Sequence, residues 1–365
     1  MAKKNEASAK QKDLSVSTTK GADSFASESE ALFVGIDLGT SSSVIAASNG
    51  VREVVPSFVG FPKDNIAEEL LGTEPLFGDA ALRHRLSVEL IRPLAKGVIQ
   101  ETKGGENINL KAAQLLVKHL LHLARPKPGQ PVYGVIGAPA RASISSKRIL
   151  VDAARGILNA VMICSEPFSV AYGLGILDRA LIIDIGAGTT DLCRLHGTLP
   201  TDEDQITFDV AGDYVDQEFA KAIRAKHPDV QFTINMVKAI KEQNGFVADS
   251  ADKILVKFPV KGRPQEIDVT NELRAACRTI VPPTIDAIAE LIASYDPEFQ
   301  EELRNNVILA GGGSQMIGLP KLIEQGMKEL GGGKVRRVEE PVFAGANGAL
   351  KMAKRMPKNF WQILA

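Results

Sequence analysis

Apolar residues follow two alternating patterns along this chain, and both begin after residue 30. Short continuous apolar runs, such as those at residues 31–38 and 307–310, predict buried strands. Residues 111–125 instead place their apolar side chains three and four positions apart, which predicts an amphipathic helix. Strands that alternate with helices in this way are typical of an α/β fold with parallel sheets.

Capping residues and prolines locate the ends of several elements. Ser143 is suited to cap a helix over residues 143–158, because its hydroxyl can accept a bond from a backbone N–H group. Pro282 and Pro283 fall inside the helical pattern at residues 271–294 and predict a break or kink there. Further elements are predicted as a strand at 132–137, a helix at 166–173 with Pro167 in its first turn, a β-hairpin at 253–269 and a helix at 321–330.

One pattern occurs twice, at residues 31–47 and again at residues 180–195. Each copy is an apolar run, an Asp-x-Gly sequence, a few small or hydroxyl residues and a second apolar run. Asp37 in the first copy matches Asp184 in the second. Each copy therefore predicts a β-hairpin with an acid at the tip of its first strand. Two such hairpins predict two related halves of one molecule that face each other.

The small residues at the two turns favour binding of an anion. Glycine lets the backbone approach a ligand closely, and several N–H groups of one turn can then point at a phosphate. A carboxylate beside a bound phosphate would be repelled unless a cation lies between them, and Mg²⁺ is the expected cation. One such hairpin alone is better explained as an ordinary tight turn. The pair together favours the two sides of one Mg-polyphosphate site.

Five segments, in the order found here, resemble those of the actin, Hsp70 and sugar-kinase superfamily of ATP-binding proteins. They are two phosphate hairpins, two connecting segments and an adenosine segment, at residues 37–43, 184–191, 136–155, 343–350 and 309–313. Together they lie within residues 31–350, and the sequence contains no Walker A pattern. The resemblance implies an actin-like α/β ATPase fold, with two related domains around a nucleotide cleft.

The resemblance also implies domain boundaries. The first domain is expected at residues 31–165, with a small subdomain at about 55–108. The second domain is expected at residues 166–340, with a lid subdomain at about 228–270. Residues 341–365 are expected to return to the first domain.

Composition narrows the classes of function. Residues 1–30 are polar and predict a disordered tail, either a tether for an adaptor or a solvated extension. A formal net charge of −1 argues against a surface that coats nucleic acid. No apolar run approaches the ~18 residues of a spanning helix, and the tail has no apolar stripe, so no direct membrane insertion is expected. Three cysteines without pairing or metal-ligand spacing fit a reducing cytoplasm.

The resemblance places ATP in the cleft and assigns a role to each matching position. Phosphate contacts fall to the two turns, at Gly39, Thr40, Ser41, Ser42, Gly186, Ala187, Gly188, Thr189 and Thr190. Contacts to Mg²⁺ fall to Asp37, Asp184 and Asp191. Adenosine contacts fall to Gly212, Lys241, Glu242, Gly311, Gly312, Gly313 and Ser314. Catalysis is assigned to Glu166, which would orient the attacking water with help from Thr189, and to Asp184 at the metal.

Some of these roles have simpler alternatives. Glu166 would also complement the positive end of a helix without any catalytic role. Lys241 and Glu242 lie in a short match, and a solvated helix face explains them equally well. Two positions depart from the sequence usual in rod-shape actins, where Asp191 stands for glutamate and Ala187 for glycine. Asp191 keeps the negative charge on the metal side, whereas Ala187 can alter how closely its turn approaches phosphate, and neither departure argues against nucleotide binding.

Within the superfamily, the chain most resembles bacterial actins, and among them the actin-like proteins of magnetosomes. Residues 137–143, 164–175 and 182–193 carry this resemblance. It implies a cytoplasmic, ATP-hydrolysing protein that polymerises with itself into cytoskeletal filaments and positions magnetosomes, with magnetosome-associated or adaptor proteins as partners. The alternatives are a cell-shape filament like the rod-shape actins, a small-molecule kinase, and a chaperone-like or scaffold ATPase that acts as a monomer.

Overall fold

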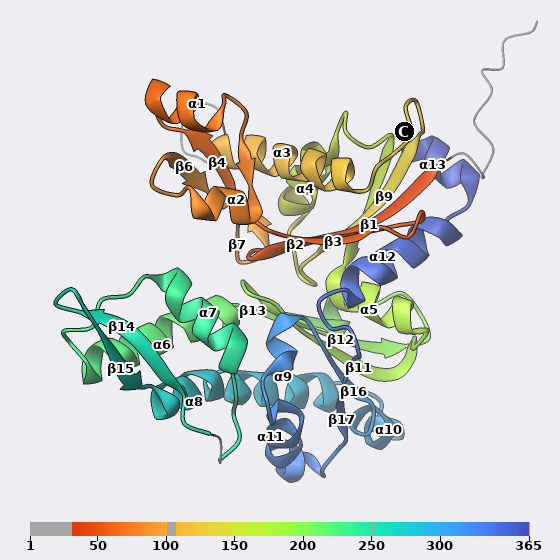
Figure 1. The fold of residues 1–365 in the computed structure, drawn as a ribbon. Helices are drawn as coiled ribbons and strands as arrows, with labels where there is room; N and C mark the ends of the chain where they lie inside the picture. The colour runs from red at the N-terminus through yellow and green to blue at the C-terminus, as the bar shows by residue number, and fades with distance from the viewer. Residues whose placement is uncertain (1–30, 101–106, 250–251, 365) are drawn as a thin grey trace, which may run out of the picture.

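Two five-stranded sheets dominate the computed structural model, which describes residues 31–100, 107–249 and 252–364 (Figure 1). The first sheet has the order β10-β9-β1-β2-β3, formed by Ala160–Ser165, Val132–Ala138, Leu32–Leu38, Ser42–Ala47 and Arg52–Pro56. The second has the order β13-β12-β11-β16-β17, formed by Gln205–Phe208, Thr190–His196, Asp178–Ile185, Val307–Ala310 and Val335–Arg337.

The two sheets share one topology, and the duplicated sequence lies at the same place in each. β1 pairs antiparallel with β2 and parallel with β9, and β11 pairs antiparallel with β12 and parallel with β16. A further antiparallel strand follows on the hairpin side, and a further parallel strand on the other. Asp37 and Asp184 are each the last residue but one of the corresponding strands β1 and β11. The predicted hairpins and the actin-like fold class are confirmed.

Helices cover each sheet and build its core. In the first half, α3 (Ile108–Leu123) packs on α4 (Ile144–Ala154) and buries five side chains, Ala112, Ala113, Leu116, Val117 and Leu120. In the second half, α6 (Gly212–Lys226), α8 (Thr270–Arg278), α9 (Val281–Ala293) and α11 (Leu319–Gly326) contribute to one large apolar cluster. α10 (Gln300–Arg304) packs beside β11, and α13 (Lys358–Leu364) beside β10.

Two helices join the halves. α5 (Glu166–Leu174) follows the first sheet, α12 (Ala344–Arg355) comes near the end of the chain, and they pack on each other between the sheets (Figure 1). A Cβ added at Gly348 would lie 1.8 Å from the carbonyl oxygen of Ser169. The helix backbones therefore approach so closely that only glycine fits at this crossing.

Each half also carries a smaller unit, drawn at the left of Figure 1. In the first half it contains β4 (Val59–Pro62), β5 (Leu76–Phe77), β6 (Val88–Ile91), α1 (Asn65–Leu71) and α2 (Gly78–Arg83). In the second half it contains α7 (Ile234–Asn244) and the hairpin β14 (Leu255–Val260) and β15 (Arg263–Asp268). A short hairpin, β7 (Leu94–Ala95) and β8 (Val98–Ile99), follows the first unit. The predicted domain boundaries stay predictions, and the predicted tail lies outside the described residues.

Local signals located most helix starts correctly but missed two ends. The Ser143 hydroxyl accepts a bond from the backbone N–H of Ser146 at 3.0 Å, as predicted for a cap. The predicted break at Pro282 and Pro283 is confirmed, because α8 stops at Arg278 and α9 begins at Val281. The prediction of helix to residue 158 is wrong, since Arg155 is extended and ends α4. The prediction to residue 330 is also wrong, because α11 ends at Gly326 and a 3₁₀ turn follows.

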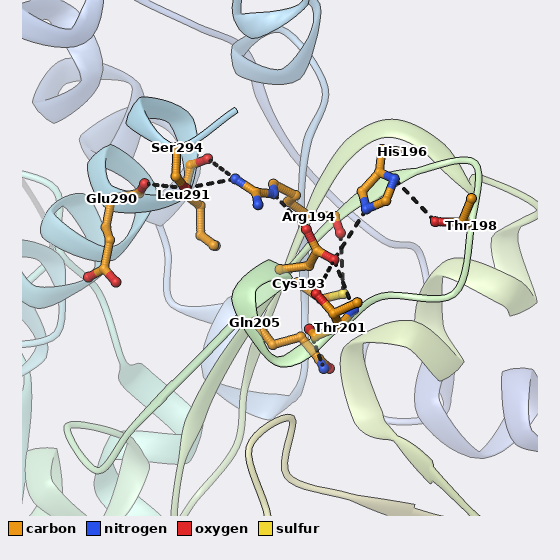
Figure 2. Close-up of polar contacts among 10 residues, drawn as sticks. Cys193, Arg194, His196, Thr198, Thr201, Gln205, Glu290, Leu291 and Ser294 are labelled. Carbon is orange, nitrogen blue, oxygen red and sulfur yellow. Dashed lines mark hydrogen bonds and ion pairs between the residues drawn. The ribbon is translucent and has the colours of Figure 1, made fainter. Parts of the chain in front are cut away.

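A buried charge network fixes the far end of the second sheet (Figure 2). Arg194 on β12 is paired with Asp204 at 2.8 Å, and their side chains are 9% and 5% exposed. On its other side the guanidinium donates to the carbonyl of Leu291 and the hydroxyl of Ser294, at the C-terminal end of α9. A cation at a helix C-terminus is favourable. The network therefore ties β12, the turn before β13 and α9 together.

Candidate functional site

A cavity of about 370 Å³ lies between the two halves, where the hairpin tips meet. Most residues predicted from the sequence line it. From the turns these are Gly39, Thr40, Ser41, Ser42, Gly186, Ala187, Gly188 and Thr189, and the acids are Asp37, Glu166 and Asp184. From the second half come Gly212, Lys241, Glu242, Gly311, Gly312 and Gly313. The structure thus brings segments from the whole folded chain to one cleft.

Three predicted residues are buried and do not belong to this lining. Thr190 donates to the carbonyl of Val210 at 3.0 Å, and Ser314 donates to the carbonyl of Gly311 at 2.7 Å. Asp191 accepts bonds from the Ala140 backbone N–H and the Thr207 hydroxyl, at 2.7 and 2.6 Å. Each of these side chains therefore holds the backbone around the cavity, and Asp191 joins a loop of the first half to the second.

Other lining residues were missed by the sequence analysis. They are Val44, Val54, Gly97, Asp213, Lys238, Gly245, Gln315, Met316, Pro341 and Val342. Lys238 could have been found, since it lies three and four positions before Lys241 and Glu242 and shares their helix face. Its ammonium donates to the hydroxyl of Ser41 across the cleft. The remaining residues carry no local signal of a ligand.

The hairpin tips are built from contacts that require small residues. The turn of the second tip is closed by a bond from the Gly186 N–H to the Thr189 carbonyl, at 2.9 Å. A Cβ added at Gly188 would lie 2.3 Å from the Thr40 hydroxyl oxygen and 2.9 Å from the Gly97 nitrogen. Gly188 is therefore the position at which the second tip touches the first half, and a larger residue would push the halves apart.

The second tip is also tied to the start of α6. The Gly212 N–H donates to the Gly186 carbonyl at 3.1 Å, and the Asp213 N–H donates to the Ala187 carbonyl at 2.8 Å. These bonds place the N-terminal end of a fifteen-residue helix beside the cavity. Such an end carries partial positive charge and stabilises an anion placed near it.

Three acids in the cleft are placed where their charged forms are disfavoured. Burial, and then the carboxylate of Asp191, raise the pKa of Asp37 from 3.8 to about 6. The pKa of Asp184 is raised well above its usual range by burial and by Asp37 and Asp191. Burial and the same neighbours, with Asp184, raise the pKa of Glu166 in the same way. A cation among these groups would stabilise all three ionised forms.

The donor set fits Mg²⁺ bound together with phosphates. No group of three ligating side chains converges on one point within the residues that the structure describes. Mg²⁺ does not need such a group, because it keeps several waters and takes one or two carboxylates besides the substrate phosphates. Asp37 and Asp184 line the cavity from opposite halves and are the two carboxylates that would hold the ion.

The residues predicted to contact adenosine divide into two kinds. Gly312 has open space around it, whereas a Cβ at Gly313 would lie 2.3 Å from the Ile185 side chain. Gly313 therefore allows close packing on β11. Lys241 lies 2.9 Å from a carboxylate oxygen of Asp216 and donates to the Gly212 carbonyl at 2.8 Å. Its ammonium is held inside the protein and supports the start of α6.

Two sheets of matching topology, with Asp-x-Gly hairpins facing one cleft, define a protein of the actin, Hsp70 and sugar-kinase class. The MreB/Mbl protein family matches residues 31–360, and the chain belongs to this family. It is 38% identical to "Actin-like protein MamK" of Paramagnetospirillum magneticum, over 91% of this chain and 95% of that protein. It is also 38% identical to MamK of Magnetospirillum gryphiswaldense, over 90% and 91%. The solved "MamK double helical filament" superimposes with a TM-score of 0.86 at 38% identity, covering 89% of this chain and 99% of that one.

These similarities bear out the expected branch of the family. The chain is an actin-like protein similar to MamK, and the MreB type is the wider family. Within the described residues, no helix is both long enough and apolar enough to cross a bilayer.

Proposed function

We propose that this protein binds ATP with Mg²⁺ in the cleft, hydrolyses it, and thereby controls a filament of identical subunits. The observation that carries the proposal is the meeting of two phosphate-type hairpin tips from opposite halves around one cavity. A non-polymerising MamK mutant that is 38% identical to this chain is bound to AMPPNP, with a TM-score of 0.68. This supports a nucleotide in the corresponding place here.

The lining residues would divide the work of hydrolysis. Backbone N–H groups and hydroxyls of both turns would hold the phosphates, and Asp37 and Asp184 would hold Mg²⁺, partly through water. Bound Mg²⁺ would neutralise phosphate charge. Glu166 would orient the attacking water with help from Thr189, since phosphoryl transfer to water depends mainly on positioning and charge stabilisation. Asp191 would position Thr189, with which its carboxylate shares a side-chain hydrogen bond, and its predicted contact with Mg²⁺ stays a prediction.

Cleft closure would connect hydrolysis to assembly. One nucleotide held by both halves would fix their relative position, with α5 and α12 as the joint. A head-to-tail contact between identical subunits that does not close on itself produces a filament. The relative described as a MamK double helical filament supports this for the present chain. We further propose a cytoplasmic cytoskeletal location, the domain boundaries stated above, and a role in positioning magnetosomes with adaptor partners.

The test measures phosphate release and pelleting of the purified chain with Mg-ATP, without any other substrate. Wild-type protein is expected to release phosphate and form a polymer that later disassembles. Glu166→Ala is expected to bind ATP and polymerise but to lose about 10²- to 10⁴-fold in turnover, because the group that positions the water is gone. Its polymer should therefore persist.

The matched control is Glu69→Ala, since Glu69 is exposed on α1 and does not line the cavity. It should behave as wild type. Unchanged turnover in Glu166→Ala would remove Glu166 from catalysis. Phosphate release that requires an added small-molecule acceptor would favour a kinase, and turnover without ATP-dependent light scattering would favour a monomeric ATPase.

A further inference from the structure

Arg92 is the side chain that links both phosphate hairpins, and neither the sequence analysis nor the cavity lining pointed to it. It precedes the short hairpin β7–β8 in the first half. Its Nε donates to the Thr40 carbonyl of the first tip at 2.7 Å. Its NH2 nitrogen lies 2.8 and 3.0 Å from the two carboxylate oxygens of Asp213. Asp213 is the second residue of α6, and its backbone N–H donates to the Ala187 carbonyl of the second tip.

We propose that Arg92 is a positioning residue that sets the spacing of the two phosphate hairpins for ATP hydrolysis. The inference rests on the proposed function, because it assigns a role within that reaction. Arg92 acts through Thr40 on one side and through Asp213 on the other. Because it bonds both, the groups that hold the phosphates should shift together when the two halves move relative to each other.

The chemistry of arginine suits this role. A guanidinium is planar and carries five donors in a fixed fork, so it can bond a carbonyl and a carboxylate at once. Arg92 and Asp213 are 32% and 29% exposed, so their ion pair is partly shielded from solvent. Thr40 is held from a second direction as well, because the Gly97 N–H donates to its hydroxyl at 2.8 Å. Arg92 and Gly97 thus hold the first tip at two points.

A second cation of the same segment provides a contrast. Lys96 pairs with Asp209 across the cleft, but the two side chains are 67% and 57% exposed. Neither side chain bonds a residue of the hairpin tips in the described part of the chain. Exposed pairs of this kind contribute little. Lys96→Met is therefore the matched control for Arg92→Met.

The experiment measures kcat and KM for ATP hydrolysis by the full chain, with binding of a fluorescent ATP analogue as a separate readout. Arg92→Met is expected to lower kcat by about 10- to 100-fold with little change in binding, because a small misplacement of reacting groups carries a large rate penalty. Arg92→Lys keeps the charge but loses the fork, and should fall between wild type and Arg92→Met. Lys96→Met should match wild type.

A double-mutant cycle separates positioning from general damage. Asp213→Asn removes the partner charge at constant size and should reproduce much of the kcat loss, and the double variant should be no slower than Arg92→Met. This arm also tests the inference if Arg92→Met does not fold. The positioning role of Arg92 would be overturned if Arg92→Met kept the wild-type kcat, or if the losses of the two single variants simply added in the double variant. Either result would leave the proposed function in place. A wild-type chain that neither binds nor hydrolyses ATP would overturn the proposed function itself.

Discussion

Two groups of buried charges in this protein are arranged in opposite ways. In the cleft, Asp37, Glu166 and Asp184 lie near other carboxylates, and burial with mutual repulsion raises their pKa values. At the far end of the second sheet, Asp204 is buried beside Arg194 and accepts several bonds. Burial raises its pKa, but bonds from the Thr201 backbone, Arg194, His196 and the Thr201 hydroxyl outweigh this and lower the pKa to about 2.

This comparison distinguishes a binding site, whose buried acids need a cation, from a structural network, whose buried acid has its partners in the protein. The Asp204 carboxylate has its partners within the chain, so its charge serves the fold. The charged forms of the cleft acids reduce stability until a cation binds beside them, so their charge serves binding. Removing a charged side chain from the Arg194–Asp204 network should therefore lower the free energy of unfolding. Removing an acid from the cleft should raise the free energy of unfolding and impair function.

The largest expected effect on stability comes from breaking the complete network. Arg194→Met should lower the free energy of unfolding by about 3–5 kcal/mol, because Asp204 would be left as a buried charge without its main partner. Urea unfolding followed by circular dichroism measures this. The double variant Arg194→Met with Asp204→Asn removes the charge but keeps an oxygen that can accept the bonds from Thr201, and it should recover much of the loss. If the double variant were as unstable as the single one, lost packing rather than the unpaired charge would be the cause.

Removing an acid from the cleft is expected to increase the stability of the ligand-free protein. The pKa of Asp37 is raised from 3.8 to about 6, so the ligand-free protein loses stability as pH rises from about 4 to about 6. Asp37→Asn should therefore stabilise the ligand-free protein at pH 7 by about 1–3 kcal/mol, with no gain below about pH 4. Asp286→Asn, at an exposed position of α9, is the control and should change little. A loss of stability in Asp37→Asn at pH 7 would contradict the comparison.

The smallest effect is expected where an ion pair is exposed. Lys221 and Glu218 lie 2.6 Å apart, closer than Arg194 and Asp204, but Lys221 is 67% exposed. Lys221→Met should leave the urea midpoint unchanged within error, since solvent screens such pairs. A loss comparable to that of Arg194→Met would show that distance, rather than burial, decides the worth of a pair in this protein.

Structural features that depend on residues close together in the chain were predicted correctly from the sequence. The Asp-x-Gly hairpins, the cap at Ser143 and the helix break before Pro282 follow from local backbone preferences, and all three are present. The ligating roles assigned to individual residues stay predictions. Arg92 could not be found in this way, because its partners Thr40 and Asp213 are 52 and 121 positions away.

The partners of buried charged side chains could not be predicted from the sequence either. The resemblance assigned Lys241 to adenosine, but it could not show that Asp216 and the Gly212 carbonyl hold the Lys241 ammonium. Arg194 stands in a strand whose neighbours on both sides are buried, so no alternation of apolar and polar residues indicated which way it points. Both outcomes depend on partners that only the tertiary structure supplies.

The late position of α12 in the chain has a consequence for biosynthesis. This helix starts at Ala344, yet it packs on β1, where a Cβ at Gly35 would lie 2.1 Å from the Ala346 carbonyl oxygen. The first sheet therefore stays without part of its cover while the ribosome makes the whole second half. Contacts between such distant segments form slowly and leave apolar surface open meanwhile. Nascent chains should thus depend on chaperones until α12 emerges. Chains truncated before residue 344 should stay bound to chaperones.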